Sequence, residues 1–187
     1  NFTTLKHLKN QFKMNRVNLF LFVSFILFTA SNLFSQPRVV IMTDFPPVDV
    51  IPGGAGYGPA EKRSDSDDLQ SMIRFLLYAN EFKVEGLVAS SATFANFANK
   101  QNILDMLYLY DHVDENLQKH DNRFPTAENL RSVTWQGLSG TYGRPAAEII
   151  GKGKDSEASA KIIELLDKPD TNPIWLRFKS RAFPDFI

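Results

Sequence analysis

The stretch RVVIMTD, residues 38–44, opens the part of the sequence that decides the fold. Its β-branched and apolar residues predict a short buried strand over 38–42, which ends just before Asp44. The next regular apolar pattern lies between 69 and 77, where apolar residues recur at intervals of three and four, the spacing of one stripe on an amphipathic helix. The chain therefore passes from a strand to a helix, which is the first half of a crossover unit.

The alternation of strand and helix patterns continues downstream. Strands that alternate with helices predict an α/β fold, in which a doubly wound, mostly parallel sheet carries helices on both faces. The further elements that we expect are a strand over 83–91, a helix from about Lys100 to Lys119, a short helix capped by Thr126, a helix through 158–166 that stops before Pro169, and a strand over 172–178.

The first 35 residues have the layout of a secretory signal. MNRVN, residues 14–18, is a short basic segment, and the apolar run LFLFVSFILFTA follows over 19–30. A run this short is typical of a signal peptide rather than of a bilayer span, although an uncleaved anchor is the alternative. We expect upstream translated sequence over 1–13, a signal peptide over 14–35, and an exported protein, periplasmic or extracellular, with no stable membrane span after cleavage.

The remaining chain is mildly acidic. Residues 1–35 hold four basic residues and no acid, so the rest of the chain has four more acidic than basic side chains. The apolar content of 43% and charged content of 22% are those of an ordinary globular protein. An acidic body without a basic run argues against nucleic acid as a partner.

An unusual concentration of acids precedes the first predicted helix, in RSDSDDLQSM, residues 63–72. Ligands of open parallel sheets bind outside the carboxyl ends of the strands, where Asp44 and the start of this helix should meet. Helix capping explains one or two of these carboxylates. Capping does not explain Asp65, Asp67 and Asp68 together with Asp44. These carboxylates would repel one another unless a cation offset them, and Ca²⁺ accepts several carboxylate ligands. A metal site and plain capping are both consistent with the pattern.

The segment between the strand and the helix, residues 45–64, is rich in glycine and proline. Its GGAGYGP run fits neither dinucleotide-binding nor P-loop spacing, and Pro59 stands where a helix would have to begin. We therefore expect a surface loop over the edge of the site rather than a phosphate cradle.

The strand RVVIMTD and the acidic segment that follows the loop, SDSDDLQSM, resemble the opening of the nucleoside hydrolase-like proteins. The likeness is greater to an exported subgroup that is described as cellulose-binding, with a nucleoside hydrolase-like domain. It covers about Pro37 to Leu176, so that 36–176 is expected to be the N-terminal part of such a domain. The resemblance is carried by RVVIMTD (38–44), SDSDDLQSMIRFLLYANEFKVEGLVASS (64–91), NKQNILDMLYLYDHVDENLQKHD (99–121), FPTAENLRSVTWQGLSGTYG (124–143) and GKDSEASAKIIELLDKPDTNPIWL (153–176).

The resemblance implies roles for the acidic residues. Asp44 would be the base that acts on a calcium-bound water and would also ligate the metal, Asp68 would ligate Ca²⁺, and Asp67 would contact sugar hydroxyls. The substrate would be a small nucleoside or carbohydrate, and the implied reaction is hydrolysis of an N-glycosyl bond through an oxocarbenium-like state. The alternative is a carbohydrate-binding protein that keeps the fold without the reaction.

Three features depart from the family pattern or stay open. Thr93 stands where nucleoside hydrolases carry an asparagine, which puts sugar selectivity in question. Trp135 and Tyr142 are candidates for stacking on a ring, with packing of a loop against the core as the alternative. The tail over 177–187 does not resemble the family, whose members continue into a second half with a further metal-binding aspartate, and we expect a shifted or truncated reading frame there.

Overall fold

The computed structural model describes residues 36–44, 47–49, 66–91, 96–141, 143–169 and 172–178. The predicted signal peptide and the segment before it lie outside these ranges, as does most of the glycine-rich loop. Within the described ranges, no helix combines the length and the apolar character that crossing a bilayer requires.

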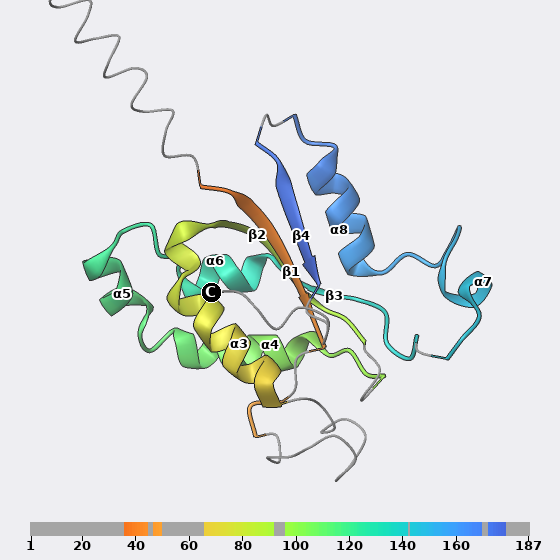
Figure 1. Cartoon of the computed structure of the whole chain (residues 1–187), viewed down its shortest axis with the longest axis horizontal. Helices are drawn as coiled ribbons and strands as arrows, with labels where there is room; N and C mark the ends of the chain where they lie inside the picture. The colour runs from red at the N-terminus through yellow and green to blue at the C-terminus, as the bar shows by residue number, and fades with distance from the viewer. Residues whose placement is uncertain are drawn as a thin grey trace, which may run out of the picture. The chain divides into compact units, whose positions relative to one another are not determined.

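A four-stranded sheet with the order β3-β2-β1-β4 forms the centre of the fold (Figure 1). Every neighbouring pair of strands is parallel. This arrangement confirms the predicted α/β fold with a parallel sheet. The strands are β1 (Arg38–Thr43), β2 (Lys83–Ala89), β3 (Thr134–Gln136) and β4 (Ile174–Phe178).

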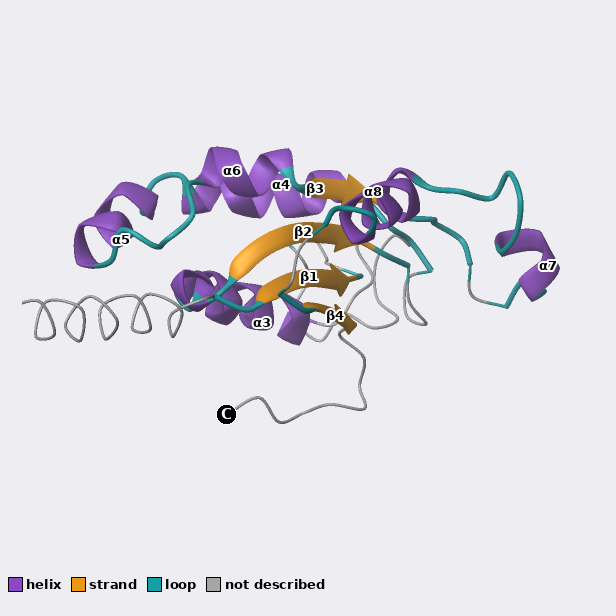
Figure 2. Cartoon of the chain, turned by 90° about the horizontal axis from the view of Figure 1, so that it is seen from above, coloured by secondary structure: helices purple, strands orange, loops and turns teal. Residues whose placement is uncertain are grey.

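Helices cover both faces of the sheet, because the two inner strands are apolar on both sides (Figure 2). Leu87 and Ala89 of β2 pack into one cluster with α3 (Ser66–Leu77), α4 (Lys100–Tyr110) and α6 (Ala127–Ser132). Val88, which lies between them and points to the opposite face, packs with α8 (Glu157–Leu166). The alternation of successive strand side chains thus divides the core into two layers.

The prediction of one helix from about Lys100 to Lys119 is wrong, because the structure has two helices there. Helix α4 ends at Tyr110, and α5 (Asp114–His120) begins after a turn. The break lets Asp114 fold inward, where its buried Oδ2 accepts a hydrogen bond from the backbone N–H of Ala127 at 2.8 Å. A continuous helix would leave this buried N–H without its carboxylate partner.

Helix α6 begins as predicted, whereas two short elements were not expected. The Thr126 side chain caps α6 by accepting a hydrogen bond from the N–H of Asn129 at 3.1 Å. Strand β3 has only three residues, too few for an alternating pattern, and α7 (Ala146–Ile149) has four. Strand β4 ends at Phe178, as the predicted strand over 172–178 does.

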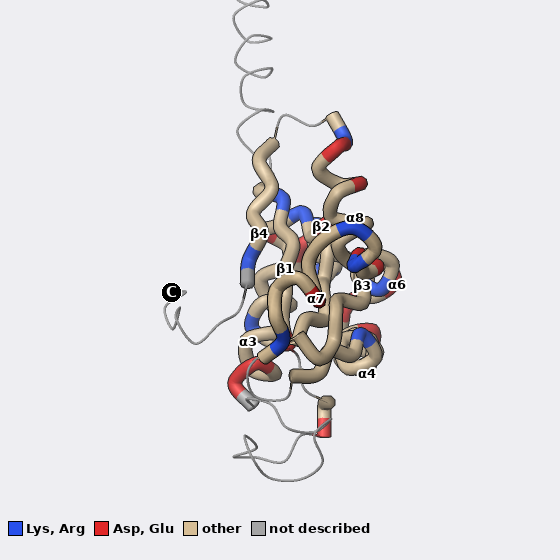
Figure 3. The backbone as a smooth tube through the Cα atoms, turned by 90° about the vertical axis from the view of Figure 1, so that its right-hand side faces the viewer, with Lys and Arg blue, Asp and Glu red and all other residues tan. Residues whose placement is uncertain are grey.

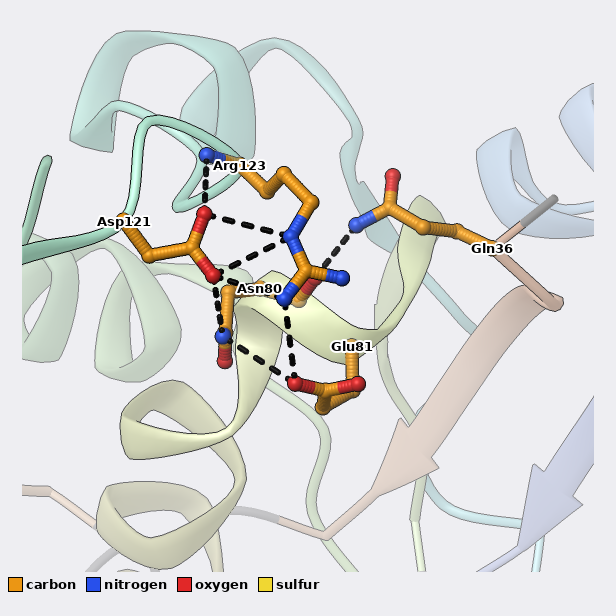
Figure 4. A network of polar contacts seen from close by, with 5 residues as sticks. All are labelled: Gln36, Asn80, Glu81, Asp121 and Arg123. Atoms are coloured by element: carbon orange, nitrogen blue, oxygen red, sulfur yellow. Dashed lines mark hydrogen bonds and ion pairs between the residues drawn. The ribbon is translucent and has the colours of Figure 1, made fainter. Parts of the chain in front are cut away.

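A network of polar contacts holds together the amino-terminal end of the sheet (Figure 4). Arg123 contacts Asp121 at 2.7 Å and Glu81 at 3.5 Å, and Asn80 donates to Asp121 at 3.0 Å. Gln36 donates to the carbonyl oxygen of Asn80, just before β1. Hydrogen bonds from Arg123 and Asn80 hold the pKa of Asp121 well below its usual range. These contacts lie where β1 and β2 begin, so they leave the carboxyl ends of the strands free for a site.

Candidate functional site at the carboxyl ends of the strands

The predicted acidic residues lie at the carboxyl end of the sheet. Asp44 directly follows β1 and is buried, with 9% of its surface exposed. Asp67 and Asp68 form the first turn of α3, and Figure 3 shows this acidic turn at the start of the helix. Figure 1 shows the tip of β1 and the start of α3 at the same end of the sheet.

The helical stripe of α3 explains why its two acids differ in exposure. Asp68 lies four and eight residues before Met72 and Leu76, which are both buried in the core. Side chains with this spacing share one face of a helix, so Asp68 is turned inward with only 5% of its surface exposed. Asp67 lies on the neighbouring face and is exposed. The site therefore offers two buried carboxylates and one that a ligand could reach.

The donor atoms at this end of the sheet are hard oxygens, the type that Ca²⁺ binds. In the part of the chain that the structure describes, no three His, Cys, Asp or Glu side chains come together as a metal-binding group. Asp44 and Asp68 thus fit part of a calcium ligand set, and further oxygens would have to come from outside the described ranges or from backbone carbonyls. Thr93 lies outside the described residues, and its predicted role stays a prediction.

The loops that follow β2 and β3 are joined at this end of the sheet. The N–H of Ala98 donates to the hydroxyl oxygen of Ser139 at 2.8 Å. The N–H of Gly140 donates to the carbonyl oxygen of Asn96 at 2.9 Å. Each loop thus supplies a backbone donor to the other, so their positions depend on each other.

The side chain of Gln136, the last residue of β3, makes three hydrogen bonds, two of which reach the segment that leads into α4. Its Oε1 accepts from the N–H of Lys100 at 2.9 Å, where α4 begins. Its Nε2 donates to the carbonyl oxygens of Ala98 at 2.9 Å and of Gly137 at 2.8 Å. No local pattern indicates this role, because the partners Lys100 and Ala98 lie 36 and 38 residues away in the chain.

Glu157 completes the arrangement from the other face of the sheet. As the first residue of α8, it accepts a hydrogen bond from the backbone N–H of Gln136 at 2.9 Å. Its carboxylate also forms an ion pair with the Lys100 ammonium at 2.9 Å. The hydrogen bond from Lys100, followed by that from the Gln136 N–H, lowers the pKa of Glu157. No local sequence pattern indicates these contacts, because Gln136 and Lys100 lie 21 and 57 residues away in the chain.

A hollow of about 270 Å³ opens beside the ends of β1 and β2. Its lining combines apolar side chains with hydroxyl groups, and two of these hydroxyls, on Ser91 and Thr141, are hydrogen-bonded to each other at 2.5 Å. Such a mixture suits a ring with an apolar face and hydroxyl groups at its edge. The lining residues are Met42, Val88, Ser90, Ser91, Gly137, Leu138, Thr141, Ser156, Ala158, Ser159 and Ile162.

Trp135 does not contribute a stacking surface. Its side chain is buried, with 7% exposed, and packs in the same cluster as Val88 and α8. The alternative of packing against the core is the one that the structure supports, although the residue lies on a strand rather than on a loop. Tyr142 lies outside the described residues.

The parallel sheet, with buried carboxylates where its strands end, defines an α/β protein whose ligand site would lie at the carboxyl edge. Comparison with protein families identifies the family within this class. A family described as cellulose-binding Sde182, nucleoside hydrolase-like domain, matches residues 60–180. The chain belongs to this family, which confirms the resemblance inferred from the sequence.

A solved structure supports the same assignment. It is described as a nucleoside hydrolase-related hypothetical protein from Saccharophagus degradans that is associated with carbohydrate metabolism. The two chains are 32% identical with a TM-score of 0.60, over 76% of this chain. The alignment covers 30% of that protein, so this chain spans less than a third of its length. A comparison with curated proteins gave no match.

Proposed function

We propose that this chain belongs to an exported, Ca²⁺-dependent hydrolase of N-glycosyl compounds, with ribonucleoside-like molecules as substrates. The observation that carries the proposal is the burial of Asp44 and Asp68 at the carboxyl edge of the sheet. Two buried acids at this edge, in a fold related to nucleoside hydrolases, are suited to work on a bound ligand. Membership of the family adds support.

The acids would divide the work between them. Ca²⁺, when bound, would lower the pKa of a water molecule and orient it toward the substrate. Asp44 would take the proton from that water, and Asp68 would help to hold the cation. Asp67, which is exposed, would accept hydrogen bonds from the sugar hydroxyls. Carboxylates at this edge would also stabilise the positive charge that develops on the sugar as the bond breaks.

Release of base from a panel of ribonucleosides, measured with added Ca²⁺ and with chelator, tests this proposal. We expect turnover that requires Ca²⁺ and that Asp44→Asn abolishes. The matched control is Asp167→Asn, because Asp167 is exposed and follows the last residue of α8, at the end of that helix away from Glu157. An absence of released base from any ribonucleoside would count against the hydrolase.

The second candidate is a carbohydrate-binding protein without catalysis. The family description and the hollow beside the strand ends favour it, because the hollow mixes apolar and hydroxyl groups. Retention on insoluble cellulose that survives Asp44→Asn, without release of base or sugar, would support this candidate. Loss of retention in the same variant would favour the hydrolase over the binding protein.

Export is the remaining part of the proposal, and it rests on the signal-like sequence over 14–35. Expression of the full chain in a bacterial host, followed by mass spectrometry of the periplasmic fraction, should show a product that lacks these residues. A full-length product retained in the inner membrane would favour an uncleaved anchor instead.

A further inference from the structure

Gln136 occupies an unusual position, because it ends an edge strand of only three residues and yet contacts segments on both sides of that strand. Its side chain reaches the loop before α4, through Ala98, and the first backbone N–H of α4, through Lys100. Its backbone N–H donates to Glu157, at the start of α8. One residue thus contacts a helix on each face of the sheet.

The ion pair between Lys100 and Glu157 closes this arrangement over the end of β3. Lys100 begins α4, whose core residues pack on one face of the sheet, and Glu157 begins α8, which packs on the other. The exposed fractions of the two side chains are 39% and 40%. Exposed ion pairs contribute little to overall stability, so the main effect of this pair is on local geometry.

The loops that meet at Gln136 are also bonded directly to each other. Among the described residues of the loop before α4, Asn96 and Ala98 bond to Gly140 and Ser139 of the loop after β3. Neither loop has a helix or strand of its own between these residues. Release of either loop would therefore break bonds that the other loop also needs.

We infer that Gln136 is a positioning residue, which together with Glu157 locks the loop before α4 and the loop after β3 into one unit that faces the ligand. The inference rests on the proposed function in one respect, since it takes the carboxyl edge of the sheet to be where a sugar binds. In this arrangement Ala98 and Gly140 are released together, and a ligand that contacts either loop gains from the same two hydrogen bonds of the Gln136 side chain, to Lys100 and Ala98.

Amide hydrogen exchange of the full chain, resolved by residue, tests the coupling without any ligand. Gln136→Ala should speed exchange at Ala98 and at Gly140 by the same factor, at least about tenfold, while the inner strands keep their protection. The matched control is Gln118→Ala, which removes a comparable hydrogen bond, from the Gln118 side chain to the carbonyl oxygen of Phe124 at 3.0 Å. It should leave both loops unchanged. Faster exchange in one loop alone, or in neither, would overturn the inference.

Two further variants keep the test decisive. Gln136→Glu retains the acceptor for the Lys100 N–H and loses the two donated hydrogen bonds, so it should give an intermediate rise in exchange. If Gln136→Ala does not fold, Glu157→Gln takes its place, because it keeps the shape of the side chain and removes its charge. An equal rise at Ala98 and Gly140 in that variant supports the coupling, and a rise confined to α8 refutes it.

Binding of cellohexaose, followed by calorimetry, separates this inference from the proposed function. If the wild-type chain binds the sugar, Gln136→Ala should weaken binding at least about tenfold, with partial rescue in Gln136→Glu, whereas a merely structural role would leave the affinity unchanged in a variant that is still folded. Unchanged affinity with opened loops overturns the positioning role and leaves the proposed function intact. If the wild type neither binds the sugar nor releases base from nucleosides, the proposed function fails, and the exchange result alone decides whether the loops are coupled.

Discussion

The close contact between Gly86 and Trp135 gives the sharpest prediction about stability. Both residues face α8, and a Cβ added at Gly86 would lie 2.6 Å from Cζ3 of the Trp135 ring. Because Trp135 is buried among Val88 and other core residues, the ring has little room to withdraw. Overpacking of this kind costs about 1–3 kcal/mol. The loss of glycine flexibility in a strand returns about 0.5–1 kcal/mol. We expect Gly86→Ala to lower the free energy of unfolding by about 1–2 kcal/mol in urea titrations, without a change in slope.

A double-mutant cycle with Trp135→Leu isolates the contact. The smaller side chain leaves room for the new methyl group, so Gly86→Ala should be neutral or slightly stabilising in that background. The coupling free energy should therefore be about 2 kcal/mol, within the range seen for residues in contact. Far-UV circular dichroism is the suitable probe, because the variants differ in tryptophan content. Equal costs of Gly86→Ala in both backgrounds would refute the packing argument.

The remaining predictions concern the helices. Burial, followed by the nearby Asp114 carboxylate, raises the pKa of Tyr110 to about 12 from its ordinary value of 10.0. The unfolded chain loses this proton first. The contribution of Tyr110 to the free energy of unfolding should therefore be fully present below pH about 10 and fall by on the order of 2 kcal/mol as the pH rises through about 12. Tyr110→Phe should remove that part of the loss in urea titrations. Asp114→Ala should cost about 1–3 kcal/mol in the same assay, because it leaves the buried N–H of Ala127 unpaired, and a cost below about 0.5 kcal/mol would contradict the role of the helix break. Ser156→Ala should cost about 1 kcal/mol in thermal melts through loss of the α8 cap on the Ser159 N–H, whereas Ser156→Asp should retain most of the stability.

Much of the fold could be predicted from local patterns. The apolar run of β1 and the stripe that includes Met72 and Leu76 reflect burial directly, and both elements form as expected. The break between α4 and α5 could not be predicted in this way, because the contact that accompanies it joins Asp114 to Ala127, 13 residues along the chain. Strand β3 is defined by its pairing with β2 rather than by a pattern of its own.

The candidate site likewise contains residues that local sequence rules predict and residues that they do not. The positions of Asp44 and Asp68 follow from the rule that ligand sites lie at the carboxyl ends of parallel strands, and the structure places both at that end of the sheet. Gln136 and Glu157 were missed, because their partners come from distant segments that meet only in the folded chain. Local sequence patterns reveal which residues are buried, but they do not reveal hydrogen bonds between distant loops.

If the acids at the carboxyl end of the sheet bind a cation, as we propose, Ca²⁺ should stabilise the folded protein. The full chain should melt at a higher temperature as Ca²⁺ is added, by several degrees once the site is saturated. Asp68→Asn should abolish that rise, while the exposed control Asp167→Asn keeps it. A rise in Asp68→Asn as large as in the wild type, or no rise in the wild type, would contradict cation binding by these acids.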